Sequence, residues 1–270
     1  MTLDLSAYFA RVGYDGPRAP TLATLHALTA AHARAIPFEN LDVLLGRGID
    51  LGLEAVFDKL VRRRRGGYCF EQNALFLHVL TALGFAARPS SARGRIFPAR
   101  DQTPPRTHLF LTVEIDGQRW LTDVGVGGLS LTSAIRLAVD VEQPTPHEPR
   151  RIVREGDHWL HQARLGDVWS DVYEFTGEEM PPIDREVGNW FTSAHPRSHF
   201  RDRLIVARAA PDGGRVTLLN GELKVRHHDG FAEVRPIASA EALLAVLSRE
   251  FGLEFPAGTR FGGPGAPWPT

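Results

Sequence analysis

Cysteine is almost absent from this chain, in which Cys69 is the single example among 270 residues. One thiol cannot form an internal disulfide, and it excludes metal sites built from clustered cysteines. Histidine is more frequent, with 11 residues, but no carboxylate motif accompanies the histidine pairs. We therefore expect no bound metal.

Long apolar runs are also missing. No run approaches the roughly 18 to 20 apolar residues that a membrane helix needs. The N-terminal string MTLDLSAYFARVGY lacks the charged and apolar regions of a secretory signal. We therefore expect a cytoplasmic protein with no membrane partner.

An excess of charge of either sign is absent as well. The chain has 31 Lys and Arg residues against 32 Asp and Glu, which leaves a net charge of -1. This balance gives no electrostatic footprint for nucleic acid, so we expect no nucleic-acid partner. With 43% hydrophobic and 23% charged residues, the composition is that of a globular protein with a sizeable core.

The first region of the chain, residues 1–85, has the hydrophobic periodicity of helices. Proline and glycine residues give most segments a plausible end. Helices are predicted over 3–14, 21–36, 53–65 and 70–85. The third closes on the arginines 62–65, which suit the negative end of a helix dipole and are expected to be solvated, with binding of an anionic cosubstrate as the alternative.

The later regions have the pattern of strands and turns. From 86 to 190, short alternating runs predict a mostly antiparallel sheet or barrel. The Pro-rich string QPTPHEPRR interrupts this pattern and is expected to be an exposed loop. From 191 to 270, further strands precede a helix that Ser239 starts and Gly252 stops.

Cys69 lies in RRRRGGYCFEQNALFLHVL, directly before an amphipathic helical pattern. The first N-H groups of a helix are unpaired and its dipole is positive there, so a thiolate is stabilised. Thiols in such places have pKa values of roughly 3.5 to 7.5, against about 8.5 for free cysteine. Gly66 and Gly67 offer backbone conformations closed to other residues and let a ligand approach the main chain. A lone cysteine is usually a small buried hydrophobe, but these flanks favour a nucleophile.

A base for this thiol is suggested by one hairpin, in THLFLTVEIDGQRWLTDVG. Its DG dipeptide at 116–117 is a strong two-residue turn signal, so Ile115 should pair with Gln118. This register puts His108 and Asp123 on one face of the sheet, with Cβ atoms within roughly 7 to 8 Å. Such a pair can be a structural hydrogen bond as readily as a catalytic one. Joined to the thiol, it completes a nucleophile, a base and an orienting group.

Several motifs together resemble the arylamine N-acetyltransferase family, and the chain looks like a bacterial member. The strings RRGGYCFEQN, RTHLFL and LTDVGVGG have that family's order and rough spacing, and IPFENLD and NWFTSAHPRSHF extend the resemblance over nearly the whole chain. It implies an α+β fold broadly like that of cysteine proteases and transglutaminases. An N-terminal helical bundle (1–85) would carry the nucleophile, a central antiparallel β-barrel (86–190) the histidine and aspartate, and a C-terminal α/β lid would follow (191–270).

The resemblance also implies an activity. Cys69, His108 and Asp123 would be a catalytic triad that moves an acetyl group from acetyl-CoA, by a ping-pong mechanism, to arylamines, arylhydrazines or N-hydroxyarylamines. Acetyl-CoA is then a cosubstrate and no cofactor is bound. The enzyme would act as a monomer or homodimer.

Four residues are expected to bind the substrate, namely Phe38, Thr107, Val126 and Phe200. Phe38 and Phe200 match family positions that line the pocket, and Thr107 adjoins His108 at its edge. The aromatics could equally be ordinary core residues and the threonine an ordinary strand residue. Val126 departs from the family pattern, which commonly has phenylalanine there. A smaller side chain predicts a wider acceptor pocket with weaker aromatic stacking.

Two other classes of function stay open at this point. A related amide synthase that closes a macrolactam, or another Cys-His-Asp acyl transferase or hydrolase, would use the same thiol chemistry on a different substrate. A noncatalytic interaction protein would carry a degenerate site, although the three intact residues argue against it.

Overall fold

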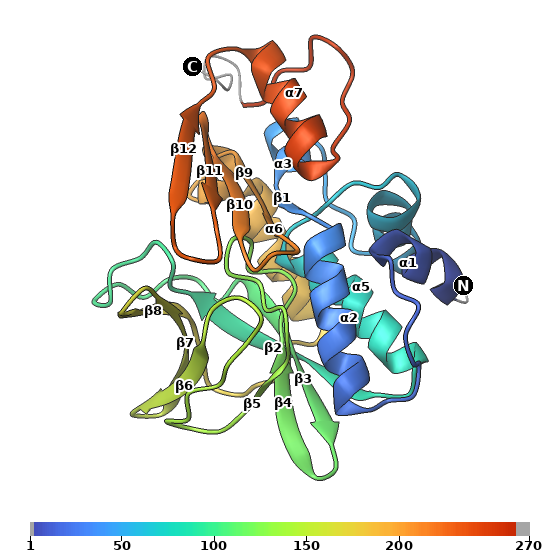
Figure 1. Cartoon of the computed structure of the whole chain (residues 1–270), viewed down its shortest axis with the longest axis vertical. Helices are drawn as coiled ribbons and strands as arrows, with labels where there is room; N and C mark the ends of the chain where they lie inside the picture. The colour runs from blue at the N-terminus through green and yellow to red at the C-terminus, as the bar shows by residue number, and fades with distance from the viewer. Residues whose placement is uncertain (1–2, 263–270) are drawn as a thin grey trace.

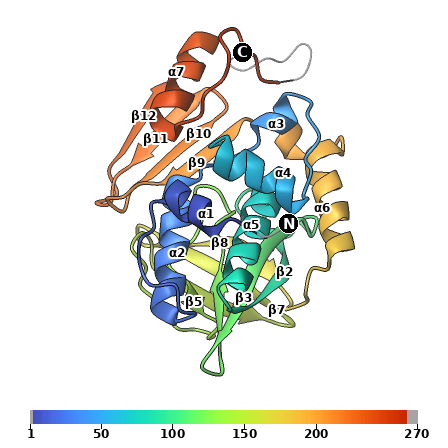
Figure 2. The ribbon, with the colours of Figure 1, turned by 90° about the vertical axis from the view of Figure 1, so that its right-hand side faces the viewer.

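The computed structural model describes residues 3–262. Within this range the N-terminal helices and a seven-stranded sheet lie side by side, and a second sheet with its own helix lies above them in both views (Figures 1 and 2). The expected α+β architecture is therefore confirmed.

The N-terminal region folds into the helices that the periodicity predicts, with shorter bounds. Asp4 and Thr21 cap the first two, because their side-chain oxygens accept the N-H groups of Ala7 and Thr24. The third predicted helix is shorter than expected and finishes in a π-helical turn. The elements are α1 (Leu5–Val12), α2 (Leu22–Ala35), α3 (Leu41–Leu44), α4 (Leu53–Phe57), the π-turn η1 (Asp58–Arg62) and α5 (Cys69–Ala82).

Helix α5 runs through the centre of this region. Its apolar residues Phe76 and Val79 belong to a core that includes Tyr8 of α1 and Leu25 of α2. Its polar residues Gln72 and Asn73 are fully buried too. Because α5 is buried on several sides, its first residue is held in a fixed position.

The seven-stranded sheet is antiparallel and nearly closed into a barrel. Its order is β5-β4-β3-β2-β8-β7-β6, and bridges from Val139 to Ile152 and from Gln143 to Arg150 bring the two edges together. The strands are β2 (Ala86–Gly94), β3 (His108–Ile115), β4 (Gln118–Thr122), β5 (Ile135–Arg136), β6 (Arg150–Glu155), β7 (His158–Leu165) and β8 (Val168–Phe175).

The predicted β3-β4 register is confirmed, since Ile115 pairs with Gln118. Asp116 and Gly117 both have positive φ, 52° and 71°, as a type I′ turn requires. The ladder continues to Leu111 opposite Thr122. Asp123 therefore follows directly after the last paired residue of β4.

The Pro-rich loop is not simply exposed, as the sequence predicted. Its Glu148 is buried, and its carboxylate pairs with Arg150 at 3.0 Å, with Arg215 at 2.7 Å and with Arg226. Burial raises the pKa of Glu148, but the charges of Arg215 and Arg150 outweigh burial and hold this pKa well below its usual range. The loop is therefore fastened between the barrel and the C-terminal sheet.

The C-terminal sheet has the order β1-β9-β10-β11-β12 and is antiparallel. Its first strand comes from the N-terminal region. Ser239 caps α7 by accepting from Ala242, and Gly252 ends it at φ 65°, as predicted. The elements are β1 (Phe38–Glu39), β9 (Ile205–Ala209), β10 (Arg215–Leu219), β11 (Glu222–Arg226), β12 (Ala232–Pro236) and α7 (Ala240–Phe251).

Helix α6 (Pro182–Ala194) was not predicted, and the expected boundary at residue 190 falls inside it. Its apolar residues Ile183, Val187 and Trp190 lie on the exposed side. The buried side carries Gly188, where a Cβ would lie 2.6 Å from the Phe70 ring. A short 3-10 helix, η2 (His199–Arg201), follows α6.

Candidate active site

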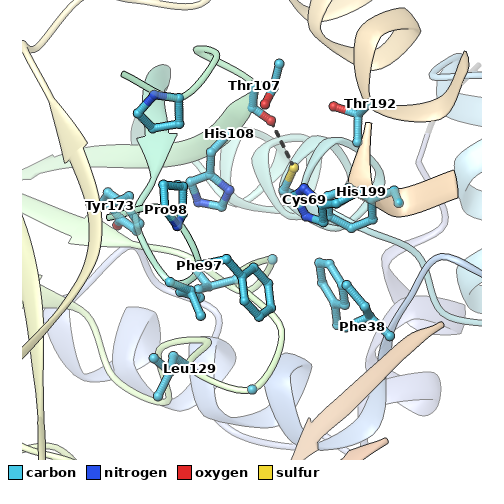
Figure 3. Close-up of a pocket in the computed structure, with 18 of the residues that line it drawn as sticks. Phe38, Cys69, Phe97, Pro98, Thr107, His108, Leu129, Tyr173, Thr192 and His199 are labelled. Atoms are coloured by element: carbon cyan, nitrogen blue, oxygen red, sulfur yellow. Dashed lines mark hydrogen bonds between the residues drawn. The ribbon is translucent and has the colours of Figure 1, made fainter. Parts of the chain in front are cut away.

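Cys69 is the first residue of α5 and is only 5% exposed. The turn before it is fixed by Glu71, whose Oε2 accepts the backbone N-H of Tyr68 at 3.1 Å. The thiol lies 3.6 Å from the carbonyl oxygen of Thr107, to which it donates (Figure 3). The predicted placement of a thiol at a helix start is therefore confirmed.

The Gly-Gly pair before this turn lies where the chain packs closely against neighbouring parts of the molecule. Neither glycine has a positive φ, so unusual backbone conformations do not explain the pair. A Cβ on Gly66 would lie 2.1 Å from the Pro37 carbonyl oxygen, and one on Gly67 would lie 2.7 Å from Glu71 Oε2. The glycines thus allow close packing of the chain against the Pro37 carbonyl and the Glu71 side chain.

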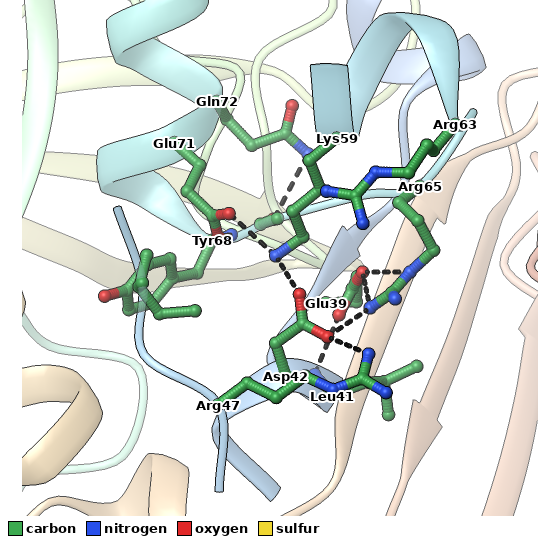
Figure 4. A network of polar contacts seen from close by, with 12 residues as sticks. Glu39, Leu41, Asp42, Arg47, Lys59, Arg63, Arg65, Tyr68, Glu71 and Gln72 are labelled. Atoms are coloured by element: carbon green, nitrogen blue, oxygen red, sulfur yellow. Dashed lines mark hydrogen bonds and ion pairs between the residues drawn. The ribbon is translucent and has the colours of Figure 1, made fainter. Parts of the chain in front are cut away.

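A buried charge network lies beneath the nucleophile turn (Figure 4), and it consists of Glu39, Asp42, Lys59, Arg65 and Glu71. Lys59 Nζ lies 2.7 Å from Glu71 Oε1 and 2.8 Å from Asp42 Oδ2. Arg65 lies 2.7 Å from Glu39 and 3.2 Å from Asp42. Burial raises the pKa of Asp42, yet Lys59 and Arg65 lower it to about 2. Arg47 adds a third cation 3.2 Å from Asp42, so three cations face the three carboxylates around the cap of α5.

The four arginines do not behave alike. Arg62 and Arg63 are exposed and pair with Glu54 and Asp58, as expected of solvated cations. Arg65 is buried, so the expectation of a solvated side chain is wrong for it. Its guanidinium is committed to the buried charge network and is not free for an anionic cosubstrate.

His108 and Asp123 form the hydrogen bond that the hairpin register predicted, with 2.6 Å between Nε2 and Oδ2. Asp123 is fully buried, and its Oδ1 accepts from Asn73 Nδ2 at 2.8 Å and from the Gly125 N-H at 2.9 Å. Asn73 lies on α5, one turn after Cys69. The helix that carries the thiol therefore also holds the carboxylate.

The His108 imidazole is electrostatically biased toward its charged form. Burial lowers its pKa, but the charge and hydrogen bond of Asp123, together with the hydrogen bond to Cys69, raise it to about 10. Because Nε2 faces Asp123, the other ring nitrogen is left for the thiol. The ring also packs 4.9 Å from the ring of Tyr173. An imidazolium in this place is the partner that a reactive thiolate requires.

Cys69 and His108 lie on the wall of a cavity of about 730 Å³. The bundle, the barrel and the C-terminal sheet all contribute to its lining. The four positions that the resemblance pointed to are in that lining, namely Phe38, Thr107, Val126 and Phe200. The rings of Phe38 and Phe200 lie 6.1 Å apart. The structure thus brings six of the predicted site residues to one cavity, and the seventh, Asp123, is fully buried and hydrogen-bonded to His108.

Two further residues contribute to the site beyond those assigned to it from the sequence. Asn73 belongs to the recognised motif, and its position four residues after Cys69 on a helix could have placed it near the thiol. Gly125 lies so close that a Cβ there would be 2.7 Å from both Cys69 Cα and Asn73 Nδ2. Nothing in a single sequence marks that contact, because it joins segments more than fifty residues apart.

Residues 3–262 contain no cluster of metal-ligating side chains and no helix of membrane-spanning character. In this range no three side chains of the histidine, cysteine or carboxylate type gather as a metal site. Nor does any helix within the range have the length and apolar character to cross a bilayer.

A thiol at a helix start, and beside it an imidazole that a buried carboxylate orients, is the arrangement typical of enzymes with a cysteine nucleophile. A family model described as N-acetyltransferase matches residues 21–259. The arylamine N-acetyltransferase of Escherichia coli K12 is 43% identical over 254 residues, 94% of this chain and 90% of that protein. That of Mycolicibacterium smegmatis is 45% identical over 258 residues, 94% of this chain and 93% of that protein.

Solved structures agree with these relatives. The arylamine N-acetyltransferase from M. tuberculosis has a TM-score of 0.89 and 44% identity, and the match covers 92% of this chain and 93% of that one. The Mycobacterium marinum arylamine N-acetyltransferase in complex with CoA has a TM-score of 0.88 and 41% identity, over 92% of each chain. The chain therefore belongs to the arylamine N-acetyltransferase family, whose members are acyltransferases.

Proposed function

We propose that this enzyme transfers an acetyl group from acetyl-CoA, through a thioester on Cys69, to arylamines, arylhydrazines or N-hydroxyarylamines. The observation that carries the proposal is that the Cys69 thiol and His108 line the same cavity, and that His108 is hydrogen-bonded to the buried Asp123 at 2.6 Å. The names of the relatives and the CoA complex of the M. marinum enzyme support the choice of donor and acceptor.

In the first half-reaction the Cys69 sulfur attacks the thioester carbon of acetyl-CoA. A carbon-sulfur bond to Cys69 forms, the bond to the CoA sulfur breaks, and His108 gives its proton to the departing thiolate. One thioester replaces another, so little bond energy changes. Asp123 keeps the imidazole oriented and stabilises its charged form.

In the second half-reaction the acceptor nitrogen attacks the acetyl-cysteine. The nitrogen-carbon bond forms, the carbon-sulfur bond breaks, and His108 takes the proton that the nitrogen loses. Arylamines suit this step because they are weak bases and remain neutral nucleophiles near pH 7. Phe38 and Phe200 would hold the flat ring, while Thr107 and Val126 would border it.

The decisive experiment is the intact mass of the protein after brief exposure to acetyl-CoA without acceptor, with the Cys69→Ala variant in parallel. We expect one acetyl group on the wild type alone, and its loss when an arylamine is added. A wild type that gains no acetyl group while Cys69 alkylates rapidly would contradict the proposal and favour a carrier-bound or amide substrate.

The sequence predictions of a cytoplasmic location and of a monomer or homodimer stay predictions. The division into three folding units stays a prediction as well. Strand β1 joins the N-terminal region to the C-terminal sheet.

A further inference from the structure

A series of buried polar side chains reaches the nucleophile turn from the N-terminal helices. It consists of Tyr8 on α1, His32 on α2 and Gln72 on α5, each of them fully buried. Tyr8 Oη lies 3.0 Å from His32 Nδ1, and His32 Nε2 lies 2.7 Å from Gln72 Oε1. All three residues lie outside the lining of the cavity that contains the thiol. We refer to Tyr8, His32 and Gln72 as the polar relay.

The relay ends on the backbone of the nucleophile turn. Gln72, which follows Glu71 on α5 (Figure 4), donates from Nε2 to the carbonyl oxygens of Pro37 at 2.8 Å and of Gly67 at 3.2 Å. The backbone link between these two segments is an isolated bridge, in which the Gly67 N-H lies 3.4 Å from the Pro37 oxygen. A hydrogen bond of that length is weak. The Gln72 amide therefore reinforces the link two residues before Cys69.

The chemistry of these groups allows one direction of donation along the relay. Because the Pro37 and Gly67 carbonyls can accept but not donate, Gln72 turns its NH₂ group to them and its oxygen to His32. His32 Nε2 therefore carries the ring proton. Burial lowers the pKa of His32 to about 4, so the ring is neutral and Nδ1 accepts from the Tyr8 hydroxyl. Burial raises the pKa of Tyr8, so this hydroxyl keeps its proton.

The tautomer of His32 decides how the Gln72 amide lies. A reversed amide would turn its NH₂ group toward a ring N-H and its oxygen toward the two carbonyl oxygens, so that its polar contacts would be repulsive. Hydrogen bonds in a buried series also polarise and strengthen one another. Tyr8 and His32 therefore hold Gln72 in the orientation that binds the turn.

We propose that the polar relay of Tyr8, His32 and Gln72 positions the Cys69 thiol for its reaction by holding the turn before it. This inference rests on the proposed function, because it concerns the reactivity of the same thiol. The three are positioning residues that act through the backbone at Gly67. Catalytic rates are sensitive to such support, since a misplacement of about 1 Å can cost about 10² in rate.

The test compares two substitutions of His32. His32→Leu removes both ring nitrogens, whereas His32→Gln keeps one donor and one acceptor. Single-turnover acetylation of Cys69 by 4-nitrophenyl acetate is followed by nitrophenolate release, at a temperature at which each variant is folded. We expect His32→Leu to slow acetylation about tenfold and His32→Gln less than about threefold. Alkylation by iodoacetamide, which needs the thiolate but no acetyl transfer, should follow the same rank order.

A matched control lies on the same helix. His26 Nδ1 lies 2.8 Å from Ser133 Oγ, away from the nucleophile turn. His26→Leu therefore removes a histidine hydrogen bond from α2 without touching the relay, and we expect both rates to stay within about twofold of the wild type.

A milder pair of variants tests the relay if His32→Leu does not fold. Tyr8→Phe removes the single hydroxyl that fixes the tautomer of His32, and we expect acetylation to slow about threefold. The control is Tyr14→Phe, because the Tyr14 hydroxyl donates to the Pro17 carbonyl oxygen at 2.5 Å and is not part of the relay. An unchanged rate in Tyr8→Phe overturns the inference.

The other outcomes separate positioning from stability. A folded His32→Leu that unfolds at lower urea but reacts at the wild-type rates overturns the inference, because its role would then be structural. Equal slowing in His32→Leu and His32→Gln also overturns it, since packing and not hydrogen bonding would matter. Slowing of His26→Leu by the same factor does so too. A wild type that alkylates rapidly but gains no acetyl group from acetyl-CoA would instead overturn the proposed function, and the alkylation rates would still test the relay.

Discussion

The buried charge network and the His108–Asp123 pair both place charged side chains inside the protein. Only the His108–Asp123 pair keeps a polar atom that a reacting group can still use. In the network, Lys59 has two carboxylate partners and Arg65 has two as well. In the pair, Asp123 accepts from His108, Asn73 and Gly125, whereas one nitrogen of His108 is turned to the cavity side.

This difference explains why the buried charge network makes the site rigid and the His108–Asp123 pair makes it reactive. A fully paired set of buried charges has nothing left to offer a substrate, and breaking it leaves an uncompensated charge. In the His108–Asp123 pair, one ring nitrogen of His108 has no carboxylate partner. The pKa of the imidazole is perturbed, and this nitrogen can still exchange a proton with the thiol. The first device holds the Cys69 turn in place, and the second acts on the thiol.

The largest effect is expected when the base of the His108–Asp123 pair, His108, is replaced. His108→Gln keeps a hydrogen-bonding group of similar size but cannot take a proton. We expect acetyl transfer to fall by about 10² to 10⁴, the usual contribution of general acid-base catalysis, in steady-state assays with acetyl-CoA and an arylamine. An unchanged rate in a folded variant would mean that His108 has no part in the chemistry.

A change in the buried charge network should lower the stability of the fold and not the rate of the reaction. Lys59→Met leaves Asp42 and Glu71 buried without their shared cation, so we expect a loss of about 3 to 5 kcal/mol in the free energy of unfolding. Urea unfolding measures it. The matched control is Arg62→Met, which removes an exposed cation and should leave the free energy of unfolding nearly unchanged. Similar losses in the two variants would contradict the distinction.

The pH dependence of stability sharpens the comparison further. The pKa of His108 is raised from 6.5 to about 10 in the folded state. A raised folded pKa gives stability that is fully present below the unfolded value and is lost as pH rises through the folded one. We therefore expect the wild type to lose stability between pH 6.5 and 10 relative to His108→Gln, measured by urea unfolding at each pH. Parallel curves would show that the pair contributes no such linkage.

The smallest effect is expected from a change in the width of the cavity at Val126. Val126 lines it where the family commonly has phenylalanine. Val126→Phe should fill space, so the rate ratio of bulky to small arylamines should fall by about three- to tenfold, a size typical of apolar pocket changes. If the ratio stays the same, Val126 does not set the width of the acceptor site.

The parts of the fold that the sequence predicted well are those specified by neighbouring residues. Helix α7 has a Ser239 cap and a Gly252 stop, and the β3-β4 hairpin has its DG turn. Because the side-chain period of a strand is two, that turn predicted His108 and Asp123 on one face, and the structure brings them together although the paired ladder ends at Thr122.

The parts that were missed depend on distant partners or on unusual patterns. Strand β2 includes Pro89 and buries Ser90 and Ser91, so it has little apolar alternation. Helix α6 has its large apolar residues on the exposed side. Arg65 is buried by Glu39, 26 residues away, and Glu148 by Arg215, 67 residues away. Whether a charged residue is buried depends on such partners, and a single sequence does not show them.

Strand β1 has a consequence for how ligands enter. Glu39 donates its backbone N-H to the carbonyl oxygen of Gly67 at 3.0 Å, two residues before Cys69, while Phe38 pairs with Ala207 of the C-terminal sheet. The sheet and the nucleophile turn are thus tied to the same two residues. A hinge motion that lifted the sheet would pull the thiol out of alignment with His108. We therefore expect ligands to enter at the rim, where Phe97 and Arg197 line the cavity, and not by a hinge motion of the sheet.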